Sequence, residues 1–122
     1  MDMKDEITYA DFDKLDIRVG TVVKAFVPEW SEKLLEFEVD FGQESGIGTR
    51  TILSGVKKWY GPEDFEGKQF VFLVNLAAKK MGPGESQGMM LMADTVNGNP
   101  GDVEKPTLIP LSEKVEDGTV VR

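Results

Sequence analysis

Two lysines and two aromatic residues stand side by side in the segment Lys57-Lys58-Trp59-Tyr60. Ammonium groups attract phosphates and flat aromatic faces stack on unpaired bases, so this combination is typical of RNA-binding surfaces. A structural interpretation competes with it, in which Trp59 and Tyr60 close the interior of the fold and the lysines only face solvent. The residues by themselves leave both interpretations open, and Trp59 is a candidate for base stacking.

Other side chains suited to RNA contact are spread along the chain. Ser86 and Gln87 carry a hydroxyl and an amide, which can reach sugars, phosphates and base edges or can satisfy backbone groups of their own loop. Asn75 could orient that loop. Trp30 is a second stacking candidate, and it would equally fill an apolar peptide pocket or pack against the fold. The candidate phosphate contacts are Lys33, Arg50, Lys79 and Lys80.

Catalysis and metal chemistry find little support. Histidine and cysteine are both absent, which removes the commonest general base, the commonest zinc ligand and every thiolate. Glu36, Glu38 and Asp40 alternate as a solvated strand face would, and no nucleophile lies near them in sequence. The glycines between 82 and 88 do not have the spacing of a phosphate-binding loop. We therefore expect a protein that is not an enzyme, with no catalytic residue, metal or cofactor.

The charge of the chain is uneven. Its 122 residues carry 14 Lys/Arg and 22 Asp/Glu, and the net charge of −8 by itself argues against nucleic acid as a partner. Residues 45–81, however, hold six basic and three acidic side chains, so this third of the chain permits a basic face. The longest apolar run, residues 70–74, is too short to cross a membrane, and the N-terminus lacks a secretory pattern. These features predict a single domain, residues 1–122, in the cytoplasm and without membrane contact.

Alternating hydropathy indicates that β-strands position these candidates. Residues 35–41 alternate strictly, with four apolar side chains on one face and three carboxylates on the other. Residues 17–25 alternate less cleanly, and Ile17, Val19 and Val23 are expected to share their inner face. Further strands are predicted at 49–54, 69–75 and 87–93.

The connections suggest the fold. Pro62, followed by two carboxylates, suits the start of a short helix, and residues 79–84 are expected to form a glycine-containing loop. Five strands with a short helix between strands three and four form an all-β oligonucleotide-binding (OB) barrel, although a small β-sandwich fits the pattern equally well. The barrel would span about residues 11–94, and a C-terminal extension about 95–122.

Several blocks of sequence, in this order and spacing, resemble the tRNA-binding domain family. They include residues 11–22, Ser54-Gly55, Val74-Asn75-Leu76 and Ser86-Gln87-Gly88-Met89. The family comprises the C-terminal module of methionyl-tRNA synthetases, free-standing tRNA-binding proteins and related secretion chaperones. The Ser-Gly and Gln-Gly pairs resemble the synthetase type. Two loops depart from the family pattern. The loop before Lys33 lacks its usual histidine and contains Trp30, and Ala77-Ala78 replaces the usual Lys-Pro.

The resemblance implies a non-catalytic module that binds tRNA by shape and backbone and serves an aminoacyl-tRNA synthetase in trans by raising the local tRNA concentration. The alternative is a chaperone-like dimer that binds unfolded or presecretory peptides, which the acidic charge, Trp30 and the methionines of residues 89–92 favour. A third is a dimerisation module with degenerate binding.

Apolar residues of the extension predict a homodimer. They lie beyond the five strands and would be costly to expose on a monomer, and the family resemblance favours their burial in a two-fold interface. The alternative is that the tail wraps its own barrel and seals an edge strand. The residues concerned are Leu108, Ile109, Leu111, Val115, Val120 and Val121.

Overall fold

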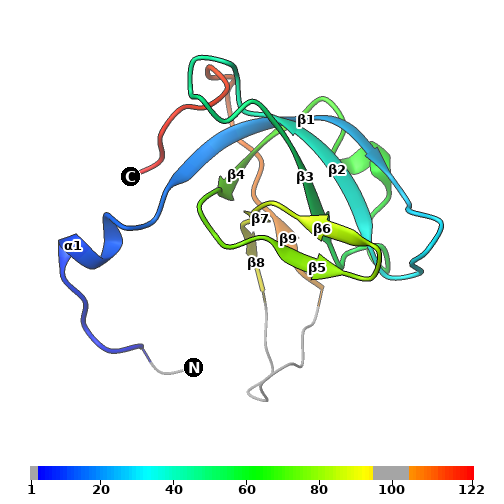
Figure 1. Ribbon diagram of the computed structural model, residues 1–122, viewed down its shortest axis with the longest axis horizontal. Helices are drawn as coiled ribbons and strands as arrows, with labels where there is room; N and C mark the ends of the chain where they lie inside the picture. The colour runs from blue at the N-terminus through cyan, green and yellow to red at the C-terminus, as the bar shows by residue number, and fades with distance from the viewer. Residues whose placement is uncertain (1–2, 95–104) are drawn as a thin grey trace.

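The computed structural model describes residues 3–94 and 105–122. Five antiparallel strands form one curved sheet in the order β3-β2-β1-β4-β7, which curls into a nearly closed barrel (Figure 1). This arrangement confirms the all-β class and the OB type and excludes the sandwich. The strands of the barrel are β1 (Ile17–Phe26), β2 (Leu35–Asp40), β3 (Thr49–Ser54), β4 (Gln69–Leu73) and β7 (Met89–Met90).

Short elements complete the fold. The helix predicted between the third and fourth strands is η1 (Pro62–Asp64), and a further helical turn, α1 (Tyr9–Phe12), precedes the barrel. No helix in the described part of the chain is long and apolar enough to cross a membrane. The predicted loop at 79–84 is instead the start of a hairpin, β5 (Lys79–Met81) and β6 (Gly84–Ser86).

The predicted fifth strand, 87–93, is divided. Only β7 belongs to the barrel, where it pairs with β4. After Leu91 comes β8 (Met92–Ala93), which pairs with β9 (Thr107–Leu108) of the tail. The strand is divided because its two halves have different partners.

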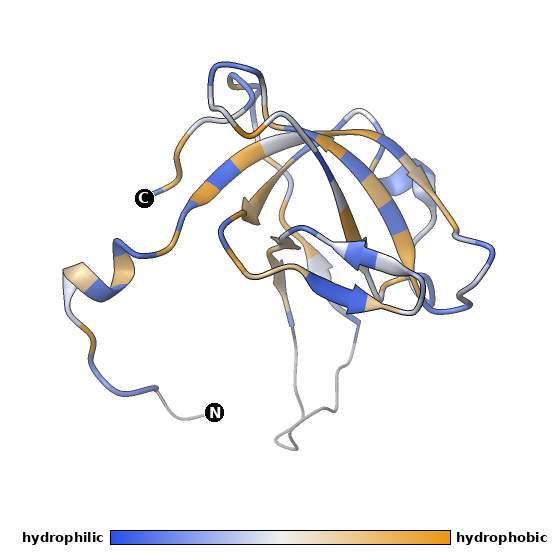
Figure 2. Ribbon diagram, viewed as in Figure 1, coloured by the Kyte–Doolittle hydropathy of each residue, from blue (hydrophilic) through white to orange (hydrophobic). Residues whose placement is uncertain are grey.

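The core confirms the alternation of β2. Leu35, Phe37 and Val39 are fully buried, whereas Glu36 and Glu38 lie on the opposite face, and Figure 2 shows this alternation along the strand. Phe65, which directly follows η1, enters the same core. Its ring centroid lies 4.6 Å from that of Phe37 and 5.7 Å from that of Phe70.

The predicted inner face of β1 is wrong. A β-bulge shifts the pairing with β2 between Val22 and Lys24, so Val22 is fully buried while Val23 is 52% exposed. Gly20 also faces inward, because a Cβ there would lie 2.6 Å from Cγ1 of Val39. Val19 is buried, but outside the core cluster and beneath the tail, whose Gly118 donates a backbone hydrogen bond to its carbonyl.

The described tail, residues 105–122, lies along its own barrel. Leu111 N donates to Gln69 O (3.0 Å), and Gln69 Nε2 donates to Val115 O (2.7 Å). Beyond the end of β2, Val121 N donates to Ile17 O (2.8 Å), so the tail occupies the edge of β1 that β2 leaves open. The tail therefore seals an edge strand, which was the alternative to burial in a dimer. Four of the six apolar tail residues are half-buried there, and Ile109 and Val120 remain 48% exposed.

Candidate nucleic-acid interface

The β5–β6 hairpin lies against the outer edge of β3 (Figure 1). In its register, Lys79 is opposite Ser86 and Lys80 is opposite Glu85. Both lysine side chains are exposed, and neither takes part in an ion pair within the described residues. The hairpin thus presents two adjacent cations to solvent beside the open edge of the barrel.

Ser86 joins the hairpin to the barrel. It is only 5% exposed, and its hydroxyl accepts a hydrogen bond from Leu53 N (3.0 Å) and donates one to Gly88 O (2.9 Å). A hydroxyl with one proton, buried and engaged on both sides, has little left to offer a ligand. Ser86 therefore positions the hairpin, and the prediction that its hydroxyl contacts RNA directly is not supported.

Gln87 closes the barrel with its side chain. Its backbone N donates to Thr51 O (2.8 Å), and its Oε1 accepts from Thr51 N (2.9 Å). These two hydrogen bonds have the pattern of a β-bridge to β3, except that the acceptor is the side-chain amide oxygen of Gln87 and not a backbone carbonyl. The exposed Nε2 makes no hydrogen bond within the described residues, so it is the group of Gln87 that can meet a phosphate or a base edge.

Arg50, on β3, also stabilises the closed barrel. Its Nη1 donates to Val74 O (2.5 Å) and Gln87 O (3.2 Å). The guanidinium has five N–H donors, so the donors on Nε and Nη2 are still available to a phosphate. Arg50 therefore has a structural role and stays a candidate phosphate contact, and its substitution would change the barrel as well as the charge.

Asn75 holds a different segment from the one we predicted. Its Oδ1 accepts from Asp16 N (2.8 Å), and its Nδ2 donates to Lys14 O (2.7 Å). The amide therefore anchors the chain before β1 instead of orienting the loop with Ser86 and Gln87. Asn75 therefore has a positioning role, and the second N–H of its Nδ2, on an exposed residue, makes no hydrogen bond within the described part of the chain.

Trp30 and Lys33 come from the loop between β1 and β2. The ring of Trp30, 38% exposed, lies on the glycine turn of the hairpin, close to Gly82 and Gly84. Lys33 is exposed and lies three residues further along. The structure thus brings this loop together with the hairpin that carries Lys79 and Lys80. The spacing of these glycines does not match a phosphate-binding loop. Gly82 and Gly84 instead leave room for the ring of Trp30.

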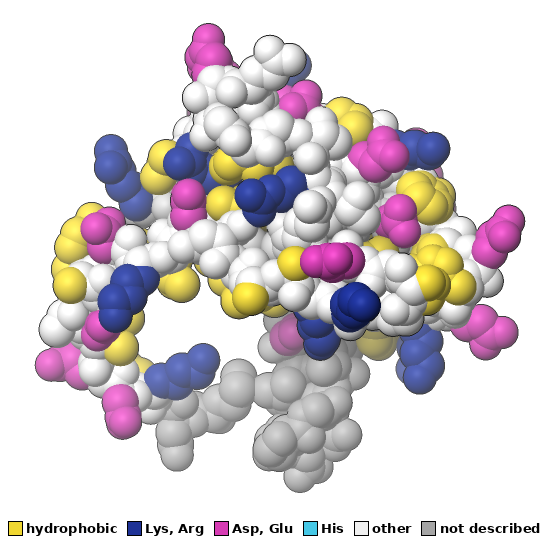
Figure 3. Space-filling view, in the orientation of Figure 1, with side chains coloured by type: hydrophobic (Ala, Val, Ile, Leu, Met, Phe, Trp, Pro, Cys, Tyr) yellow, Lys and Arg dark blue, Asp and Glu magenta, His cyan; other side chains and the backbone are white. Residues whose placement is uncertain are grey.

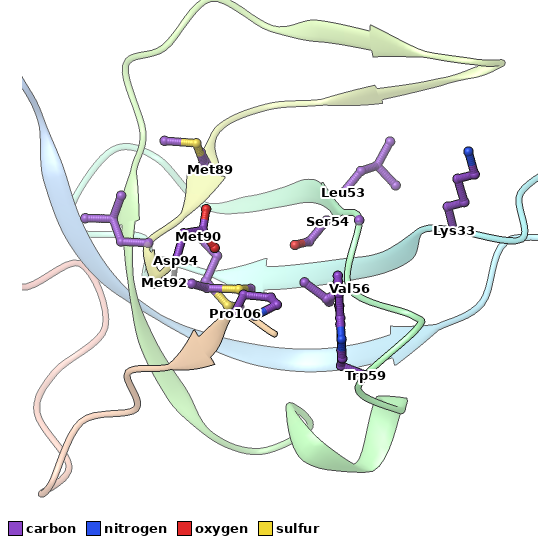
Figure 4. Close-up of a pocket in the computed structure, with 12 residues that line it drawn as sticks. Lys33, Leu53, Ser54, Val56, Trp59, Met89, Met90, Met92, Asp94 and Pro106 are labelled. Carbon is purple, nitrogen blue, oxygen red and sulfur yellow. The ribbon is translucent and has the colours of Figure 1, made fainter. Parts of the chain in front are cut away.

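Trp59 belongs to a separate groove of about 770 Å³ beneath the hairpin. It packs against the core and faces the groove, with Lys58 Nζ 5.4 Å from its ring centroid. Figure 4 shows Lys33 at one end of this groove and Met89 at the other. The lining is mostly apolar and includes Leu53, Val56, Trp59, Met89, Met90, Met92 and Pro106.

The surrounding surface is mixed in charge. Basic and acidic side chains alternate over the face shown in Figure 3, with no continuous basic patch. Glu36 and Glu38 keep the outer face of β2 acidic. In the described residues no cluster of three or more acidic side chains could hold a metal ion. A polyanion would therefore meet favourable charge at the hairpin and unfavourable charge on the wall of β2.

A five-stranded barrel of this order, with cationic and amide side chains gathered along the edge of β3, defines a protein of the OB type. Residues 17–120 match the family described as "putative tRNA binding domain". The chain belongs to this family, and the matched part is a tRNA-binding domain.

Similar proteins carry the names of tRNA-charging enzymes. The methionine–tRNA ligase of Salinibacter ruber is 41% identical over 120 residues, which are 98% of this chain and 15% of that enzyme. The corresponding enzyme of Archaeoglobus fulgidus is 40% identical over 121 residues, 99% of this chain and 17% of the enzyme. The chain thus spans only a small part of these relatives.

Two solved structures are also similar. A MetRS-related protein from Pyrococcus horikoshii has a TM-score of 0.84 at 38% identity, covering 98% of this chain and 100% of that one. The chaperone CsaA from Bacillus anthracis has a TM-score of 0.77 at 29% identity, covering 97% and 100%. The similar structures thus include one protein named as MetRS-related and one named as a chaperone.

Proposed function

We propose that this chain is a non-catalytic module that binds tRNA with the face formed by the β5–β6 hairpin, Gln87 and the loop carrying Lys33. It serves an aminoacyl-tRNA synthetase in trans in the cytoplasm by raising the local concentration of tRNA. The observation that carries the proposal is the exposed pair Lys79 and Lys80, held beside the barrel mouth of a tRNA-binding domain.

The mode of recognition follows from which donors remain available. The Ser86 hydroxyl is engaged within the protein, so the available donors are the lysine ammonium groups, part of the Arg50 guanidinium, the amide of Gln87 and one N–H of Asn75. Ammonium groups contact phosphates and carry little sequence information. We therefore propose that the module reads the shape and backbone of tRNA, with few contacts to bases.

Binding of bulk tRNA is expected to weaken steeply with salt. Three to four phosphate contacts, as Lys33, Lys79, Lys80 and Arg50 could provide, would release enough counterions to lower the affinity roughly 40- to 150-fold between about 50 and 200 mM salt. A mobility-shift or filter-binding titration at these two concentrations measures the change. An affinity that stays constant would contradict binding through the phosphate backbone.

The apolar groove favours a second candidate function, the binding of unfolded or presecretory peptides. Met89 is exposed at its rim, and methionine side chains adapt to varied apolar shapes. The similarity to a chaperone supports the same candidate. Failure of bulk tRNA to bind at either salt concentration, together with quenching of Trp59 fluorescence by an unfolded apolar peptide, would replace the first function by the second.

We also propose that residues 1–122 act as one domain, with a barrel at about 11–94 and an extension at about 95–122, of which 95–104 lie outside the described residues. The hydrogen bonds that join the tail to β1 and β4 support this organisation. Within it, Ile109 and Val120 keep an apolar surface on the tail.

A homodimer would cover this surface. Ile7 and Tyr9 are also largely exposed on the segment that projects from the barrel (Figure 1), and α1 buries none of its residues. We expect light scattering with size-exclusion chromatography, at tens of micromolar protein, to give twice the chain mass of 13.5 kDa. The double variant Ile109→Ser/Val120→Ser should shift the mass toward the monomer. A wild-type monomer under these conditions would rule the dimer out.

A further inference from the structure

The ring of Trp30 lies directly on the backbone of two glycines in the hairpin turn. A Cβ added to Gly82 would lie 2.8 Å from Cζ3 of Trp30, and a Cβ added to Gly84 would lie 2.7 Å from Cζ2. Side-chain carbons do not approach this closely, so the ring occupies space that only glycine leaves open at both positions. The contact therefore depends on both partners, the tryptophan and the paired glycines.

This contact supports the part of the hairpin that is furthest from its anchor. Each strand of the hairpin has only three residues, and two-stranded hairpins of this size are marginal on their own. At its base, the hydrogen bond from Leu53 N to the Ser86 hydroxyl fixes the hairpin to β3. At its turn, the ring of Trp30 and the side chain of Leu53 contact Gly84.

We propose that Trp30 is a positioning residue that locks the β5–β6 hairpin onto the loop between β1 and β2, so that Lys79, Lys80 and Lys33 are held in one arrangement before tRNA arrives. This inference rests on the proposed function of the hairpin. Fixing a binding surface in advance lowers the conformational cost of association. The role differs from stacking on a base, because it acts on the hairpin also when no tRNA is present.

A cycle of four proteins tests the lock: wild type, Trp30→Ala, Gly84→Ala and the double variant. Gly84 is the suitable partner because it lacks the left-handed backbone angle of Gly82 (φ +61°), so its substitution adds no backbone strain. The added methyl group would meet the Trp30 ring most closely, at 2.7 Å from Cζ2, and Leu53 Cδ1 at 3.2 Å. Amide hydrogen exchange of residues 79–86 is measured without tRNA, and the Kd for bulk tRNA is measured in parallel. Trp30→Phe serves as the conservative variant.

Trp30→Ala is expected to raise hairpin exchange and to weaken tRNA binding about tenfold, which corresponds to a binding-competent fraction reduced to about one tenth. Trp30→Phe should recover most of both effects. Gly84→Ala should disturb the hairpin most in the wild-type background, where its methyl group meets both the ring and Leu53. Its effect should be clearly smaller once Trp30 is alanine and only the Leu53 contact is left. Trp30 lies outside the core cluster, so circular dichroism should show intact folding.

Two results would overturn the lock. One is unchanged hairpin exchange in Trp30→Ala, and the other is an effect of Gly84→Ala that is equal in both backgrounds. Loss of tRNA affinity in Trp30→Ala with unchanged exchange would point to direct stacking on a base instead. Failure of the wild type to bind tRNA would overturn the proposed function and the positioning role, while the exchange cycle would still report whether the contact exists.

Discussion

Reversing the charge of two hairpin lysines together, Lys79→Glu/Lys80→Glu, is expected to weaken tRNA binding at least about 100-fold, because two phosphate contacts are lost and two negative charges are placed at the same site. Both side chains are exposed and form no ion pair in the described structure. The melting temperature should therefore change by only about 2 °C, as is usual for surface substitutions. Mobility-shift titration and thermal unfolding provide the two readouts.

The matched control is Lys68→Glu/Lys114→Glu. It makes the same change in net charge, and both lysines line a separate groove between β4 and the tail. Equal losses of affinity in the two variants would mean that tRNA responds only to overall charge and would refute a hairpin site. Arg50 is left unchanged, because its bonds to the Val74 and Gln87 carbonyls would add a structural effect.

Removing the tail by truncation after Asp94 is expected to unfold the protein. The tail supplies hydrogen bonds to both β1 and β4, and its clamp on Gln69 involves a buried side chain. The half-buried apolar residues of the tail would be lost as well. Together these losses are expected to equal or exceed the total stability of a small domain, about 5–15 kcal/mol. Circular dichroism with urea unfolding would measure the result.

Full-length Ile109→Ser/Val120→Ser serves as the control for this truncation. Its substituted residues belong to the tail but are about half exposed, so it should melt in the same cooperative way as the wild type. A soluble truncated fragment with a cooperative transition would show that the barrel does not need the tail. It would also restore the simpler idea that the extension only mediates association.

Prediction from the sequence succeeded where the local pattern of residue types determines the structure. The strict alternation of β2, the bounds of β3 and the start of η1 at Pro62 were all predicted correctly. It failed on β1 because Val22 and Val23 are chemically identical, so hydropathy could not reveal which of them faces inward past the bulge. A single additional residue in a strand reverses every assignment that follows it.

The site was predictable in its charges but not in its hydrogen bonds. Lys33, Lys79 and Lys80 lie exposed near the hairpin, whereas Ser86 and Asn75 are engaged within the protein. Except for Gly88, which is two positions from Ser86, their partners lie 33 and 59 to 61 positions away, and a single sequence does not reveal such distant pairings. The ring of Trp30 on the hairpin glycines is a contact of the same long-range kind.

The return of the tail to β1 has a topological consequence. Because Val121 N bonds to Ile17 O, the chain enters and leaves the barrel at one edge, to the left in Figure 1, whereas the glycine turn of the hairpin points to the right. Adjacent entry and exit points let a domain be joined to another protein at either end, or inserted within it, without distortion. The fold can thus be attached through either end, and the proposed RNA-binding hairpin points away from the connection in both cases.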